Sequence, residues 1–65
     1  MGAITPEHRA RRRFHNLAWH AVYHARTHEE ADVIERVVHA TRAGHIPLRD
    51  AHAALSALRR DQQAA

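Results

Sequence analysis

Apolar residues recur every three or four positions along most of the chain, which is the spacing of one face of an α-helix. The first such run is Phe14, Leu17, Ala18, Ala21, Val22 and Ala25. The second is Ala31, Val33, Ile34, Val37, Val38, Ala40 and Thr41, and the third is Leu48, Ala51, Ala54, Leu55 and Leu58. No segment alternates apolar and polar residues as a half-buried strand does. The pattern predicts an all-α protein of three helices.

Residue types that begin helices stand before the first and second apolar runs. Thr5 precedes Pro6, which suits an N-cap followed by proline at the first helical position. Thr27 precedes Glu30 by three residues, the spacing of a capping box. We therefore expect a helix to begin at Pro6 and another to begin directly after Thr27.

The other helix ends are predicted from glycine and proline. Gly44 suits the left-handed position that closes a helix, and Pro47 suits the start of the next one. The predicted helices are 6–26, 28–43 and 47–61. Residues 1–4 and 62–65 are expected to fray at the two ends of a single domain, 1–65.

No glycine or proline separates the first two apolar runs. The alternatives are one continuous helix through Thr27 and two helices with a break there. In a continuous helix the apolar stripe of residues 31–41 would point nearly opposite to that of residues 14–25. A break at Thr27 lets the second helix fold back, so that both stripes face inward. We expect a helical hairpin with a third packed helix, in which the wide apolar face of the second helix makes it the central one.

The length of 65 residues limits the core that this chain can bury. After Met1 it holds four Val, three Ile, four Leu, Phe14, Trp19 and Tyr23 as larger apolar residues, together with 14 alanines that favour helix and allow close contact. Because domains of this size gain stability from association, we expect a homodimer.

Composition excludes several classes of protein. There is no cysteine, hence no disulfide framework, and no apolar run has the length of a membrane span or signal peptide. We therefore expect a cytoplasmic protein that does not contact membranes. All ten cationic residues are arginine, as GC-rich coding favours, which suggests a high-GC bacterium or one of its phages as the source.

The net charge of +3 is divided unevenly along the chain, with basic ends around an acidic middle. Such segregation suits a polyanionic partner, although scattered solubilising charge is the alternative. The first hypothesis is a small regulatory DNA-binding protein. Its expected nucleic-acid contacts are Arg9, Arg12, Arg13, Arg49, His52 and Arg60, on the exposed sides of the first and third helices.

The second and third predicted helices resemble a helix-turn-helix over residues 28–60. Ala40 and Gly44 have the spacing of that motif, and Arg49 and Arg60 would lie on the outer face of the second helix of the pair. The sequence departs from the pattern at His45, where an apolar residue is usual. The resemblance rests on a helix, a glycine-containing turn and a second helix with a basic outer face.

The second hypothesis is a protein-interaction module that dimerises or docks on a larger host protein. Its contact surface would be Trp19, Val22, Tyr23 and Arg26, since Trp, Tyr and Arg are the types enriched at interface hot spots. Aromatic residues one turn apart also pack on each other within a fold, which is the simpler interpretation of Trp19 and Tyr23.

Eight histidines raise the question of a metal site. His28, Asp32, Glu35 and His39 form one stripe on the predicted second helix, and His20 and His24 are one turn apart. A solvated ionic face explains that stripe as well, so we expect no metal and no other cofactor. Protonation of all eight would take the charge from +3 to +11 and strengthen binding to any polyanion.

Catalytic signatures are not apparent in the sequence. Ser56 is the only serine and stands in a regular helical pattern, without the strained turn of a nucleophile. No glycine-rich phosphate loop is present, and a chain of this length offers little room for a substrate pocket. We expect that the protein is not an enzyme.

Overall fold

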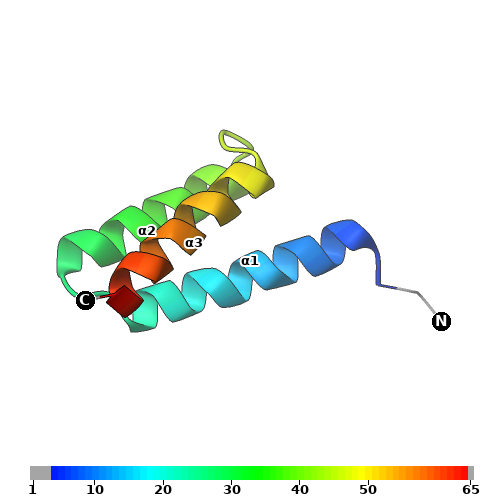
Figure 1. Ribbon diagram of the computed structural model, residues 1–65. Coiled ribbons are helices and arrows are strands. Elements are labelled where there is room, and N and C mark those ends of the chain that lie inside the picture. The colour runs from blue at the N-terminus through cyan, green and yellow to red at the C-terminus, as the bar shows by residue number, and fades with distance from the viewer. Residues whose placement is uncertain (1–3, 65) are drawn as a thin grey trace.

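The computed structural model describes residues 4–64, and three helices form nearly all of this part of the chain (Figure 1). They are α1 (Pro6–Tyr23), α2 (His28–Arg42) and α3 (Leu48–Ala64). All three pack against one another, and no strand occurs between residues 4 and 64. The prediction of an all-α, three-helix protein is confirmed.

The residues predicted to begin or to end helices are found at those positions. The Thr5 hydroxyl accepts a hydrogen bond from the His8 amide at 3.1 Å, and the Thr27 hydroxyl accepts one from the Glu30 amide at 3.1 Å. Beyond α2, Gly44 has a φ of 81°, a left-handed conformation that costs glycine no Cβ clash. These local interactions fix the first and second helix starts and the end of α2.

Two predicted helix ends are wrong by three residues, and two further bounds differ by one residue, at Arg42 and Leu48. α1 ends at Tyr23 rather than at 26, and α3 continues to Ala64 rather than ending at 61. In both cases contacts between helices, described below, decide the end. The expected fraying concerned residues 1–4 and 62–65, of which 1–3 and 65 lie outside the described residues.

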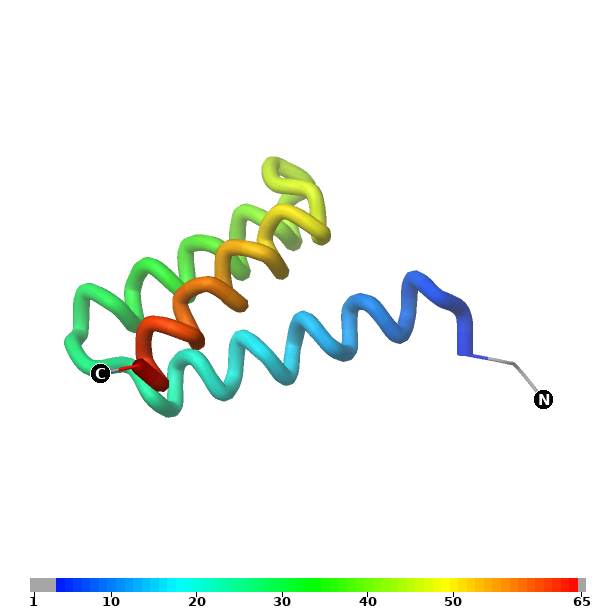
Figure 2. Tube along the Cα trace, in the orientation of Figure 1, coloured from blue at the N-terminus to red at the C-terminus, as the bar shows by residue number. Residues whose placement is uncertain are grey.

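The chain runs back and forth between two ends of the molecule, as the tube in Figure 2 shows. We call the end that holds residues 24–27 and the last turn of α3 the closed end. The open end holds the start of α1 and the α2–α3 connection, residues 43–47. Toward the open end α1 diverges from the other two helices, and its first turns extend beyond them (Figures 1 and 2).

The core is small and contains no polar side chain among the described residues. Its buried members are Phe14, Ala18, Ala21, Ile34, Ala51 and Leu55, with Leu17, Val37, Val38, Ile46, Leu48 and Leu58 packed around them. Half of the buried residues are alanine, and such small side chains let the helix backbones approach closely. Ala54 and Val33, expected to be buried, are exposed. Val33 lies about 100° around the helix from Ile34, the buried residue of α2.

The prediction that the second helix is central is also wrong. Each helix contacts both of the others, but α1 makes the more extensive contact with each partner. The face of α1 that carries Phe14, Ala18 and Ala21 is therefore the main packing surface. Because Val33 is exposed, the apolar face of α2 that meets the other helices is narrower than the sequence pattern indicated.

At the closed end the side chain of Gln62 joins all three helices. Its amide nitrogen donates to the Ala21 carbonyl of α1 at 2.9 Å and to Glu30 Oε1 of α2 at 2.8 Å. The Arg59 guanidinium donates to the Gln62 amide oxygen at 2.9 Å and so orients it. The carbonyls in the last turn of a helix lack intrahelical partners. The hydrogen bond from Gln62 gives the Ala21 carbonyl a partner where α1 ends.

The Glu30 carboxylate is the acceptor at the centre of this closed end. Arg26 donates to its Oε2 through Nε at 3.0 Å and Nη2 at 2.7 Å, and the Arg26 amide approaches Oε1 at 3.3 Å. The Glu30 side chain is only 13% exposed. The hydrogen bonds from Arg26 and Gln62 lower the pKa of Glu30 from 4.5 to about 2. Residues 24–27 are not helical, and within this connection the Arg26 side chain is held against Glu30.

Within residues 4–64, none of the helices combines the length and the apolar character that crossing a bilayer requires.

Replacing Ile34 by Ala should lower the free energy of unfolding by about 2–5 kcal/mol, because Ile34 is fully buried and its loss leaves a cavity. Val33, the adjacent residue, is 50% exposed, so Val33→Ala should change stability by about 0.5 kcal/mol or less. Urea unfolding followed by circular dichroism measures both. Equal losses for the two variants would contradict this core.

The depressed pKa of Glu30 predicts a pH dependence of stability. The group binds protons less readily when folded, so its contribution is present above the ordinary pKa of 4.5 and is lost as the pH falls toward about 2. Glu30→Gln should therefore be less stable than the natural chain at pH 6, and the difference should shrink steadily between pH 4.5 and 2. Thermal unfolding across this range tests it, with the exposed Glu29→Gln as control. A difference that is unchanged at pH 2.5 would contradict the assignment.

Candidate functional site

Six arginines gather at the open end of the molecule from three segments of the chain. They are Arg9, Arg11, Arg12 and Arg13 of α1, Arg42 at the end of α2 and Arg49 at the start of α3. We call this set the cationic end. All six are exposed. Four lie in the first turns of α1, which diverge from the other helices in Figure 2, and Arg42 and Arg49 flank residues 43–47.

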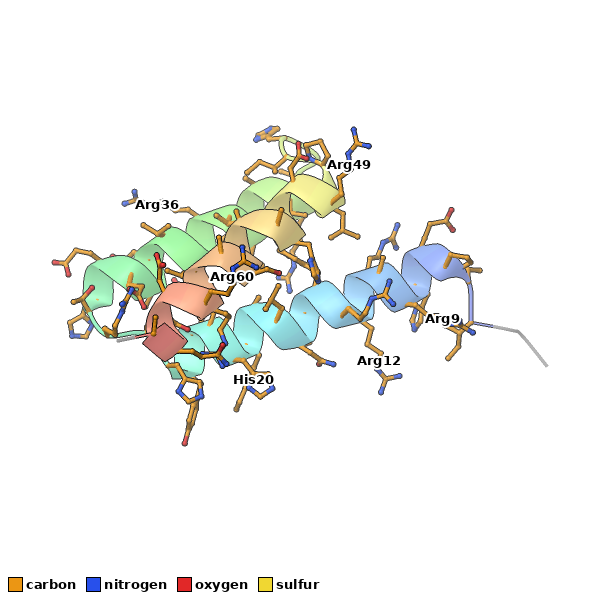
Figure 3. All side chains as sticks on the ribbon, viewed as in Figure 1. Arg9, Arg12, His20, Arg36, Arg49 and Arg60 are labelled. Atoms are coloured by element: carbon orange, nitrogen blue, oxygen red, sulfur yellow. The ribbon has the colours of Figure 1, made fainter. Side chains whose placement is uncertain are left out.

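Arg9 and Arg12 occupy the outer face of α1. In Figure 3 both side chains extend from the helix on the side away from α2 and α3, and His20 follows them farther along the same side. The structure thus keeps these residues free of the bundle, as the helical pattern predicted. This outer face is convex and open to a partner of any size.

Arg13 and Arg49 meet across a pocket between α1 and α3. The pocket has a volume of about 720 Å³ and is lined by Ala10, Arg13, Pro47, Leu48, Arg49 and His52. Three of the expected nucleic-acid contacts, Arg13, Arg49 and His52, are therefore brought together. Sequence periodicity alone did not reveal this, because it does not give the angle at which two helices diverge.

The polar residues of α3 are not all exposed on one outer face, as the helix-turn-helix resemblance had suggested. His52, expected on the exposed side of this helix with Arg49 and Arg60, is half-buried, and so is Ser56 one turn farther along. The Ser56 hydroxyl lies 3.4 Å from His52 Nδ1. Arg60 is exposed but lies more than two turns along α3, toward the closed end, so it is separated from the cationic end.

A second depression follows the boundary between α1 and α2. It consists of two cavities, of about 650 and 330 Å³, that share His15, Ala18, Val38 and Arg42. We call their combined surface the α1–α2 groove. Its other lining residues are Arg11, Phe14, Trp19, Val22, Glu35, His39, Thr41 and Leu48. The groove has an apolar floor and a polar rim.

Most of the cationic end has no counter-charge within the protein. From residue 4 to residue 64, no carboxylate lies within 4 Å of Arg9, Arg11, Arg12, Arg13 or Arg42. Arg49 approaches Asp50 at 3.9 Å, but the two side chains are 90% and 64% exposed, so this pair is weak. The guanidinium groups are therefore available to anionic partners.

Arg11 and Arg42 were missed as candidate contacts. Their positions flank the apolar faces of their helices, so the pattern alone gave them no outward face. Arg26, expected at the protein interface, is instead held by Glu30 and also donates to the Asp61 carbonyl at 3.4 Å. Its place in an interface stays a prediction.

Trp19 and Tyr23 form an exposed aromatic pair on α1. Their ring centroids are 5.6 Å apart with an interplanar angle of 11°, a stacked arrangement. Trp19 is 59% exposed and Tyr23 is 71% exposed, and Val22 beside them is 39% exposed. The two rings pack on each other, as the simpler interpretation of the sequence held, yet both remain accessible.

The histidine stripe of α2 lies on exposed positions. Within the described span no three His, Asp or Glu side chains come together in a way that could hold a metal ion. His28, Asp32, Glu35 and His39 are all exposed, and Glu35 and His39 also line the α1–α2 groove. Glu35 and His39 therefore form part of the polar rim of the groove.

No protein-family model matches this chain, and comparisons with curated proteins and with solved structures find no similar protein. The features that bear on function are therefore the charge and shape of the cationic end and of the α1–α2 groove.

Proposed function

We propose that this protein binds nucleic acid through its cationic end, with duplex DNA as the preferred ligand. The observation that carries the proposal is the convergence of six arginines from α1, α2 and α3 at one end of the molecule. Five of them have no carboxylate partner among the described residues. Arginine guanidinium groups bind phosphate oxygens through charge-assisted hydrogen bonds.

The distribution of the remaining charges supports this proposal. At the open end six arginines face only Glu7 and Asp50, which gives a net charge of +4. Elsewhere four arginines and five carboxylates give −1, and the two parts make up the total of +3. A field of this polarity orients the open end toward a polyanion during encounter.

The form of α1 suits a DNA groove better than a small ligand. Its first turns extend from the bundle, and arginines occupy its outer face and both flanks. An α-helix is about 10–12 Å wide, close to the width of the major groove of B-DNA. Arg9 and Arg12 would then contact phosphates on one side of the helix, while Arg13 and Arg49 contact the other strand.

The proposed contacts differ from the helix-turn-helix scheme. In that motif the second helix of the pair enters the groove, whereas here His52 and Ser56 of α3 are half-buried. The projecting start of α1 is the element with free arginines on several sides, so it is the proposed DNA-contacting helix. Asn16 lies one turn beyond Arg12 on the outer face, and an asparagine amide can pair with an adenine edge.

Anisotropy of labelled duplex DNA at several salt concentrations between about 50 and 200 mM tests the proposal. Four to six phosphate contacts predict a plot of log affinity against log salt with a slope of about −4 to −5. Arg12→Ala and Arg49→Ala should each weaken binding and reduce the slope by about 0.9, and the double substitution by about 1.8.

Arg36→Ala is the matched control, because it removes the same charge from α2 at a distance from the cationic end (Figure 3). It should leave both affinity and slope almost unchanged. Absence of binding at 50 mM salt would overturn the proposal. Equal effects of Arg12→Ala and Arg36→Ala would show that binding depends on total charge and not on this surface.

A further inference from the structure

We infer that the α1–α2 groove is the contact surface for a second copy of this chain, in a twofold-symmetric antiparallel dimer. The groove shares Arg11 and Arg42 with the cationic end, but its remaining residues, including Glu35 and Trp19, are not among those assigned to nucleic acid. The inference would hold if the protein bound no DNA.

The floor of the groove is an apolar surface without a covering element. Phe14 and Ala18 of α1, Val38 of α2 and Leu48 of α3 line it. Trp19 and Val22 extend the apolar surface along its α1 edge. An aromatic side chain beside a depression of this depth is the usual form of an interface anchor, since it can fill the corresponding depression of a partner.

The rim of the groove carries both signs of charge in a definite order. Along α2, Glu35 comes first, His39 follows one turn later and Arg42 stands near the open end. Seven residues separate Glu35 from Arg42, a rise of about 10 Å, so the two cannot pair within one helix. Neither makes an ion pair with any residue between 4 and 64.

A twofold axis near His39 would satisfy both charges. In a twofold dimer, if one residue contacts a second across the interface, the second contacts the first on the other side. Antiparallel placement of two α2 rims therefore sets Glu35 of each subunit opposite Arg42 of the other. The same operation sets the α1 edge of each subunit, which carries Trp19, opposite the α1 edge of its partner and beside the partner's apolar floor.

The exposed area of the single chain leaves room for such a contact. The chain exposes 5154 Å², whereas a compact monomer of 7.4 kDa is expected to expose about 4200 Å². The excess of roughly 950 Å², part of which belongs to the projecting start of α1, compares with about 800 Å² that each partner buries in a standard interface.

A second copy explains the groove better than nucleic acid does. Glu35 would repel phosphates, and the hydrogen-bond donors of the groove, such as Arg42 and His39, lie on its rim, while the apolar floor offers none. Another copy brings the complementary charge and an apolar edge in one arrangement, from the same set of residues.

Charge reversal with complementation tests the dimer. The natural chain should sediment at twice 7.4 kDa at concentrations of about 100 µM. Glu35→Arg and Arg42→Glu should each raise the dimer dissociation constant on the order of 100-fold, because each places two like-charge contacts in the symmetric interface. Mixing the two variants should restore association as a heterodimer, in which both contacts again join opposite charges.

Matched controls are Glu29→Arg and Arg36→Glu, which reverse exposed charges of the same helix outside the groove lining. They should leave the dissociation constant within about threefold. Trp19→Ala changes an exposed position and should weaken association at least tenfold without loss of helical circular dichroism. It serves as a second test if a reversal variant unfolds.

A natural chain that remains a monomer up to about 1 mM would overturn the inference. So would folded Glu35→Arg and Arg42→Glu variants that fail to associate when mixed, or a Trp19→Ala variant that dimerises normally. DNA binding by Arg12→Ala is measured separately, so failure of the dimer and failure of the proposed function can be told apart.

Discussion

The hydrogen bonds of the Glu30 carboxylate connect the three helices at one end of the molecule. Arg26 and Gln62 both donate to this group, and Gln62 also reaches the Ala21 carbonyl. Few large side chains are buried, so this polar cluster determines where α1 stops and how far α3 extends. Held together there, the helices are free to diverge at the other end. That divergence creates the open end, its pocket and the groove.

The division of charge follows from the same arrangement. Carboxylates near the closed end are used for structure or face solvent around it, and the arginines of the cationic end are left without partners. A small protein with a neutral or evenly mixed surface would give no indication of its ligand. Here the proposed DNA surface and the proposed dimer surface use different sides of α1. Its outer side carries Arg9 and Arg12, and its side toward α2 carries Trp19 and Val22.

The sequence predicted those helix starts and ends that depend on interactions between residues close together in the chain. The caps at Thr5 and Thr27 and the turn at Gly44 were recognised because each rests on hydrogen bonds or backbone conformation within a few residues. The end of α1 could not be predicted, since it involves Gln62, 41 residues after Ala21. Individual arginines could be placed on helix faces. The meeting of Arg13 with Arg49 depends on how far α1 diverges from α3, which periodicity does not contain.

Mapping of backbone amide shifts by NMR during addition of duplex DNA is the most direct test of this two-ended account. Amides of residues 9–13 and 42–49 should shift in proportion to the DNA added, while those of Arg26, Glu30 and Gln62 should remain in place. That result would show that the open end receives the ligand and the closed end maintains the fold. Shifts concentrated at residues 26–30 and 59–62, or distributed evenly over all three helices, would contradict it.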